Sequence, residues 1–69
     1  MDLTERERNV LFYLAQGYNN NEIGNILNIS VHTVKAHLET IYEKFSVNNR
    51  VQAVIKGLQM HCIDVKELV

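Results

Sequence analysis

Apolar residues recur every three or four positions in four stretches of the chain, with polar residues between them. This spacing predicts helices that each bury one face, because an α-helix returns to the same side after about 3.6 residues. The predicted helices cover about residues 5–16, 20–27, 31–45 and 50–60. The side chains expected to face the core from the first three helices are Val10, Leu11, Leu14, Ala15, Ile23, Ile26, Leu27, Val34, Leu38, Ile41, Tyr42 and Phe45.

A residue that can cap a helix precedes each of these stretches, since its side chain can accept a hydrogen bond from the first backbone N–H groups. These residues are Thr4, Asn19, Ser30 and Asn49. Glu7 and Glu22 stand three positions after the first two caps, which completes the reciprocal pattern called a capping box. Gly17 and Asn28 follow the first two helices, and both residue types tolerate the left-handed backbone that commonly ends a helix. The chain is therefore expected to be a series of helices joined by short turns.

The second and third predicted helices have the features of a helix-turn-helix. Two helices that cross at a steep angle need a small side chain where they meet, and Gly24 meets this need. A glycine inside a helix costs up to ~1 kcal/mol relative to alanine, which indicates a packing reason for its presence. Asn28 makes the turn, and Val34 is expected to point from the third helix toward the second. The fold predicted for residues 1–69 is one all-α, four-helix domain that contains a helix-turn-helix in helices two and three.

The fourth predicted helix is apolar over an arc of about 220° when projected at about 100° per residue. One core covers roughly half of such an arc, so the remainder calls for a second partner. Ala53 and Gly57 are expected to face the core. The predicted dimerisation surface comprises Val51, Val54, Leu58 and His61. Two courses remain open for the tail from His61 to Val69, which either extends this helix or turns back.

The composition bears on three features of the chain: disulfide bonds, membrane spans and signal peptides. Cys62 is the only cysteine of the 69 residues, so no disulfide can form within the chain. The longest apolar run, Val10 to Ala15, is far shorter than the roughly 20 residues of a membrane span. The acidic start of the chain does not fit a signal peptide. These features lead us to expect a soluble, cytoplasmic domain with no membrane partner.

The formal net charge of −1 argues at first against binding to the DNA backbone. The charges are unevenly placed, however, because residues 1–30 carry a net −2, residues 31–56 carry +2 and residues 57–69 carry −1. The charged residues of the middle segment are Lys35, Lys44, Arg50 and Lys56, with Glu39 and Glu43 opposing them. This asymmetry predicts a weak attraction to phosphates around the third helix.

The outward face of the third predicted helix carries short or polar side chains and no bulky apolar group. Its residues are His32, Lys35, Ala36, Glu39 and Glu43. A helix that presses against base edges in the major groove of DNA needs such a face. The pattern therefore favours binding to double-stranded DNA.

Several motifs in register resemble one family over about residues 3–60. Leu3 to Leu11 reads LTERERNVL, which is similar to the opening signature LTxREREVL of the LuxR/NarL-type (GerE-like) effector domains of bacterial transcription regulators. Later matches include Ala15-Gln16-Gly17, Ile29-Ser30, Thr33-Val34-Lys35-Ala36-His37 and Gln52-Ala53-Val54. The resemblance implies a tetrahelical domain that binds DNA as a homodimer. It also implies that such a domain is often attached to a phosphorylated receiver or a ligand-sensing domain.

The resemblance also implies which residues meet DNA. Base contacts are expected from Lys35, Ala36 and Glu39, with His32 beside them. Phosphate contacts are expected from Thr33, His37, Lys44 and Arg50. Asn20, in the asparagine run that chiefly caps the second helix, is a further phosphate candidate from the sequence itself. The chain departs from the family pattern in several places: Glu39 stands where a cationic or polar residue is common, Asn21 replaces a frequent lysine, Gly24 replaces the usual alanine, and Phe45-Ser46 replaces a typical Leu-Gly.

Two other functions fit parts of the pattern. A promoter-reading region of a sigma factor uses a related helix-turn-helix, although the opening signature and the broad fourth helix count against it. A protein-interaction module that keeps the fold without touching DNA would suit the net negative charge and Glu39. Enzyme activity is not expected, because the sequence holds no paired catalytic acids and no glycine-rich phosphate loop. His32 and His37 are five residues apart and point in different directions on a helix, so neither a metal nor a cofactor is expected.

Overall fold

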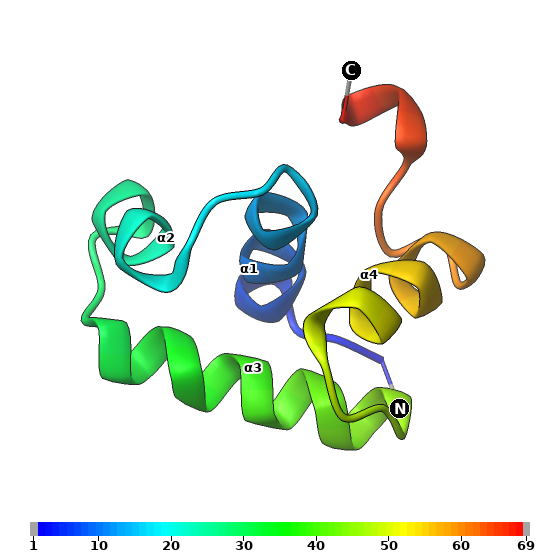
Figure 1. Ribbon diagram of the computed structural model, residues 1–69, viewed down its shortest axis with the longest axis horizontal. Coiled ribbons are helices and arrows are strands. Elements are labelled where there is room, and N and C mark those ends of the chain that lie inside the picture. The colour runs from blue at the N-terminus through cyan, green and yellow to red at the C-terminus, as the bar shows by residue number, and fades with distance from the viewer. Residues whose placement is uncertain (1, 69) are drawn as a thin grey trace.

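The computed structural model describes residues 2–68 and contains no strand within them. Its helices are α1 (Glu5–Ala15), α2 (Asn20–Leu27), α3 (Val31–Phe45) and α4 (Arg50–Gln59), followed by a short 3₁₀ turn, η1 (Val65–Glu67). The helix α3 runs along one side of the molecule, and α1, α2 and α4 all pack against it (Figure 1). The predicted all-α, four-helix fold is confirmed.

Each of the four α-helices begins with the polar cap that the sequence predicts. The caps Thr4, Asn19, Ser30 and Asn49 each accept a hydrogen bond from the backbone N–H three residues later. Both predicted capping boxes are complete, because Glu7 Oε1 accepts from Thr4 N at 2.9 Å and Glu22 Oε1 accepts from Asn19 N at 2.9 Å. These bonds satisfy N–H groups that have no partner inside the helix, which fixes where each helix starts.

Each α-helix ends in the same way, with one residue in the left-handed conformation. These residues are Gly17, Asn28, Ser46 and His61. In every case the next residue donates its backbone N–H to the carbonyl five positions earlier, as Val47 does to Tyr42 at 3.0 Å and Cys62 does to Gly57 at 2.8 Å. This is the Schellman motif, which satisfies the last carbonyls of a helix and reverses the chain sharply.

The hydrophobic core lies where the four helices meet, and α3 contributes the most buried apolar residues to it. The buried apolar residues are Leu3, Val10, Leu11, Leu14, Ile23, Val34, Leu38, Ile41, Phe45, Ala53 and Ile63. One predicted core residue is wrong, because Ile26 is 43% exposed. Around the axis of α2, the side that faces α1 and α3 extends from Ile23 past Leu27 to Gly24. Ile26 lies about 60° outside this side, next to Ile23, and therefore points toward solvent.

The tail after α4 turns back onto the domain. Helix α4 ends at Gln59, Met60 caps it, and His61 takes the left-handed conformation with φ 60°. Ile63 then enters the core, where it is 5% exposed. His61 therefore lies past the end of α4 and is exposed, so the tail follows the second of the two courses that the sequence leaves open.

Within residues 2–68, no helix has both the length and the apolar character needed to cross a membrane.

Candidate nucleic-acid interface

The turn between α2 and α3 folds closely onto Gly24. The Gly24 carbonyl accepts a hydrogen bond from Ile29 N at 2.9 Å, and an added Cβ at Gly24 would stand only 2.8 Å from the Ile29 carbonyl oxygen. Val34 is fully buried beneath this turn, as the sequence predicts. The small residue is needed because the turn backbone itself, rather than a side chain of α3, approaches α2. This contact sets α3 at a fixed position relative to α2.

The predicted contact face of α3 is open to solvent. His32, Lys35, Ala36, Glu39 and Glu43 are all exposed, whereas Val34, Leu38 and Ile41 on the opposite side are buried. The amino end of α3 is tied by Ser30, whose hydroxyl accepts from Thr33 N at 3.1 Å and pairs with the Thr33 hydroxyl at 3.0 Å. The helix therefore presents a face without large apolar groups on a rigid support.

Four predicted contact residues line one hollow of about 210 Å³ at the side of this face. Asn20 is the first residue of α2, Arg50 is the first residue of α4, and Lys35 and Glu39 lie between them on α3. The sequence places these residues up to thirty positions apart, and the fold brings them together. The amino ends of α2 and α4 also contribute their partial positive charge to this region. The side-chain oxygen Oδ1 of Asn20 is buried without a hydrogen-bond partner in the described part of the chain.

Lys44, another predicted phosphate contact, does not line this hollow. Its ammonium donates to Glu7 Oε1 at 2.7 Å and to the Asp2 carbonyl at 3.1 Å, and its side chain is only 14% exposed. The ammonium of Lys44 is therefore engaged inside the domain and is not free at the surface. The sequence alone does not indicate this ion pair, because Glu7 lies 37 positions from Lys44 and its carboxylate is already accounted for by the capping box of α1.

The carboxyl group of Glu7 is held in its charged form by these contacts. Burial alone would raise the pKa of Glu7, but the hydrogen bond from Lys44, the backbone bond from Thr4 and the positive charge of Lys44 outweigh that effect. The pKa of Glu7 therefore lies below its ordinary value of 4.5. The ion pair joins the start of α1 to the last turn of α3.

The other predicted phosphate contacts lie at varied depths. Thr33 and Arg50 are exposed, and His37 is half-buried on α3. None of these three side chains is enclosed in the core.

The outer face of α4 is apolar and uncovered. Val51 is 64% exposed and Ile55 is 50% exposed, while Val54 and Leu58 are half-buried beside them. These four residues are spaced at i, i+3, i+4 and i+7, which places them on one stripe. Ala53 and Gly57 face the core, as expected. A hollow of about 250 Å³ borders the stripe and is lined by Leu14, Arg50, Val51, Val54 and Ile55.

Residues 2–68 include no group of three or more His, Cys, Asp or Glu side chains close enough to hold a metal ion.

Comparison with known proteins places this geometry in one family. Residues 1–56 match the luxR family of bacterial regulatory proteins. The putative HTH-type transcriptional regulator YhjB of Escherichia coli K12 is 53% identical over 53 residues, which cover 77% of this chain and 26% of that protein. The nitrate/nitrite response regulator protein NarP of the same strain is 51% identical over 57 residues, covering 83% of this chain and 26% of that protein.

The response regulator protein VraR of Staphylococcus aureus strain Mu3 is 44% identical over 61 residues, covering 88% of this chain and 29% of VraR. The crystal structure of the response regulator ChrA from a heme-sensing two-component system superposes with a TM-score of 0.88 at 40% identity, over 91% of this chain and 31% of ChrA. The chain thus spans less than a third of the length of each of these relatives. The chain belongs to the luxR family of bacterial regulatory proteins, which are DNA-binding transcription regulators with a helix-turn-helix.

Proposed function

We propose that this domain binds specific sequences of double-stranded DNA and regulates transcription, with α3 in the major groove. The observation that carries the proposal is the solvent-open face of α3, which is free of large apolar side chains and is held by the Gly24 turn. A helix of this kind fits the width of the major groove and can reach base edges. The family membership supports the same function.

The base contacts follow from the chemistry of three side chains on that face. The Lys35 ammonium can donate to O6 and N7 of guanine, and the Ala36 methyl can pack against the methyl group of thymine. The Glu39 carboxylate can accept from N4 of cytosine. His32 lies one turn before Ala36 and is a further candidate at the edge of the site.

Phosphate contacts are proposed for Asn20, Thr33, His37 and Arg50. Asn20 and Arg50 begin α2 and α4, so each side chain sits beside backbone N–H groups that favour an anion. A phosphate near the hollow between them would meet the charges of Arg50 and Lys35 as well. We withdraw Lys44 from this set, because its ammonium is already held by Glu7 and Asp2.

The proposed assembly is a homodimer on an inverted repeat. The uncovered stripe of α4 supports it, since Val51 and Ile55 would be shielded from water by the same residues of a second copy. The two half-sites should lie about one helical turn apart, ~10 bp. Because the chain spans less than a third of its relatives and several of these are response regulators, we also propose that a receiver or sensor domain controls it. DNA binding would place the protein in the bacterial cytoplasm.

The proposal is tested by changing Lys35 to Ala. Binding sites are first selected from random DNA with the wild-type chain, and affinities are then measured for the selected site and for each single-base change. Lys35→Ala should weaken binding to the selected site by about 1–3 kcal/mol and remove discrimination at one position. Lys66→Ala is the matched control, because Lys66 is an exposed lysine in the tail, away from α3. An equal loss on every sequence would contradict base reading by Lys35.

A protein-interaction role remains the second candidate, supported by the net charge of −1 and by the acidic Glu39 on the contact face.

A further inference from the structure

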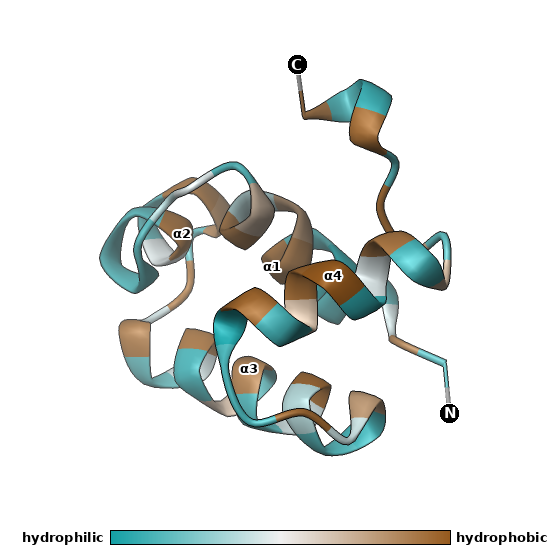
Figure 2. Cartoon of the chain, turned by 45° about the vertical axis from the view of Figure 1, so that its right-hand side comes forward, coloured by the Kyte–Doolittle hydropathy of each residue, from teal (hydrophilic) through white to brown (hydrophobic). Residues whose placement is uncertain are grey.

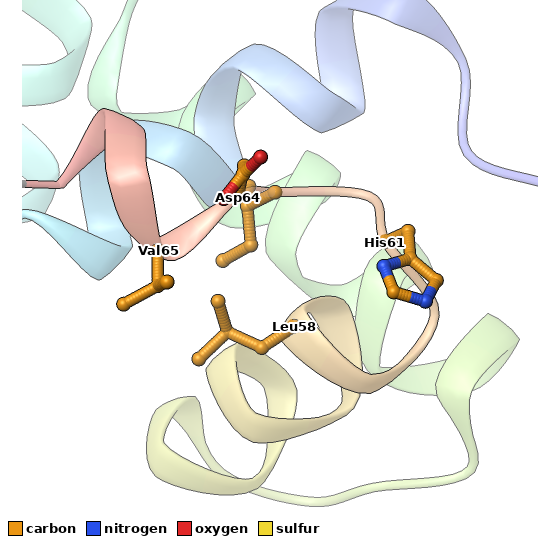
Figure 3. Close-up of a pocket in the computed structure, with 5 residues that line it drawn as sticks. Leu58, His61, Asp64 and Val65 are labelled. Carbon is orange, nitrogen blue, oxygen red and sulfur yellow. The ribbon is translucent and has the colours of Figure 1, made fainter.

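Some acidic side chains of this domain have a definite role in the fold. Glu7 and Glu22 complete the capping boxes of α1 and α2. Asp64, which lies at a groove beside the end of α4 (Figure 3), begins the short turn η1, where its Oδ1 accepts from Lys66 N at 3.0 Å. The helix or turn that each of these carboxylates begins therefore accounts for it.

Glu39 has no such role within residues 2–68. Its side chain is exposed in the middle of α3 and forms no hydrogen bond or ion pair with another residue of this range. Lys35, four residues earlier, stands in the less favourable order for a pair, since an acid stabilises a helix more when it precedes the lysine. The position is also too far from either end of α3 to gain from the helix dipole, whose effect fades within the first and last turns. Glu39 therefore contributes little to the stability of the fold.

Glu39 lies instead at the surface where DNA is proposed to bind. Figure 2 shows hydrophilic residues along the side of α3 that faces away from the other helices. On this side Glu39 lines the hollow of about 210 Å³ together with Lys35 and Arg50. Neither cation forms an ion pair within residues 2–68, so the hollow combines two unpaired positive charges with one unpaired negative charge. A phosphate that approaches the hollow is attracted by two groups and repelled by the third.

This carboxylate affects specific and non-specific DNA binding differently. A phosphate has no hydrogen to donate to Glu39, and two negative charges a few ångströms apart repel each other even in water. Non-specific binding consists essentially of such phosphate contacts, so Glu39 weakens it on every sequence. Cytosine, by contrast, offers its N4 amino group in the major groove, which a carboxylate accepts as a hydrogen bond. The repulsion is therefore offset only on DNA that places a cytosine opposite Glu39.

We propose that Glu39 is a specificity-determining residue that rejects DNA lacking a cytosine at one position of each half-site. The inference rests on the DNA binding proposed above and specifies a base of the site. One helical turn from Lys35 to Glu39 spans about 5.4 Å along the axis, and successive bases of one strand are about 3.4 Å apart. The cytosine should therefore lie one or two base steps from the guanine that Lys35 reads. Selectivity of this kind comes from a loss on unwanted sequences as well as a gain on the wanted one.

The test compares the wild-type chain with Glu39→Gln, which nearly keeps the size of the side chain and removes its charge. Sites are selected from random DNA with each protein, and affinities are measured for these sites and for duplexes of mixed sequence. Glu39→Gln should bind mixed DNA about three- to tenfold more tightly. This gain should shrink as the salt concentration rises, because salt screens the repulsion that the change removes. At one position the preferred base should change from cytosine to adenine, which glutamine reads through N6 and N7.

Glu43→Gln is the matched control. Glu43 is an exposed acid one turn further along α3, so its change alters the net charge equally, but its side chain does not line the hollow. Glu43→Gln should keep the preference for cytosine and leave binding to mixed DNA nearly unchanged. Circular dichroism verifies that both variants keep the fold, as expected for exposed positions. An equal gain from the two changes would reveal a general effect of charge and would overturn the inference.

Other outcomes separate this inference from the proposed function. If Glu39→Gln does not tighten binding to mixed DNA, or if it keeps the base preference of the wild type, the role of Glu39 is overturned. The same holds if the site selected by the wild type lacks a cytosine near the guanine read by Lys35. DNA recognition by α3 would then still be judged by Lys35→Ala. If the wild type binds no DNA at the lowest salt, both the proposed function and this inference are wrong.

Discussion

The helix ends show how single residues define this fold. Four left-handed residues close the four α-helices, but only Gly17 is a glycine. Asn28, Ser46 and His61 carry a Cβ in a conformation that costs L-residues roughly 1–2 kcal/mol. The turn at Ser46 nevertheless keeps the hydrogen bonds of a Schellman motif. The chain therefore carries backbone strain at Ser46 that a glycine would release.

Ser46→Gly should stabilise the domain. Removing the Cβ relieves the left-handed strain, and the greater freedom of glycine in the unfolded chain offsets part of the gain. We expect the free energy of unfolding to rise by about 1 kcal/mol, measured by urea denaturation. Glu43→Gly is the control, because Glu43 is exposed inside α3 with ordinary helical geometry and should lower stability by about 1 kcal/mol. A loss of stability in Ser46→Gly would contradict the strain argument.

At the scale of elements, the domain depends on contacts that fix α3 at both of its ends. The Gly24 turn holds its first residues, and the pair of Lys44 and Glu7 holds its last turn. Glu7 Oε1 accepts from both Lys44 Nζ and Thr4 N, so one oxygen caps α1 and binds α3. A change at Glu7 should therefore affect two helices together.

Glu7→Gln should destabilise the domain by about 1–3 kcal/mol at pH 7, because a largely buried ammonium loses its charged partner. The pKa of Glu7 is lowered in the folded state, so the unfolded chain binds this proton at a higher pH than the folded one does. The resulting stability is present above the ordinary value of 4.5 and is lost as the pH falls through the folded pKa.

The free energy of unfolding of wild type and variant, measured from pH 7 to pH 3, checks this prediction. The gap between them should shrink as the pH falls below about 4.5. Glu5→Gln, at an exposed acid in the same helical turn, should leave both the stability and its pH dependence nearly unchanged. A gap for Glu7→Gln that is constant over this range would argue against a charged pair.

Much of the fold follows from interactions between residues that are close together in the sequence. The caps Thr4, Asn19, Ser30 and Asn49 act within three residues, so reading the chain alone predicts where each helix begins. The exposed face of α3 was likewise predictable from helical spacing. The errors arose where distant parts of the chain decide the outcome. The burial of Lys44 depends on Glu7, and the exposure of Ile26 depends on which helices cover α2. Helical spacing also leaves the course of the tail open, and the structure turns it back so that Ile63 is buried in the core.

At the scale of the whole molecule, the net charge of −1 conceals an uneven surface. Lys35 and Arg50 gather at one hollow beside α3, whereas the positive charge of Lys44 is largely neutralised by Glu7. The domain therefore has few cations available for phosphates. Its affinity for DNA should depend on close fit and on two protomers acting together, rather than on a large basic surface.

Salt dependence of DNA binding tests the central claim most directly. The dissociation constant of the wild-type chain for its selected site is measured between about 50 and 200 mM salt. Arg50 should neutralise phosphates in each protomer, and Lys35 adds its positive charge to the groove while it reads bases. The logarithm of the binding constant should therefore fall against that of the salt concentration with a slope of about −2 to −4. A flat slope, or no binding by the dimer at the lowest salt, would contradict DNA recognition by α3 and favour the protein-interaction role.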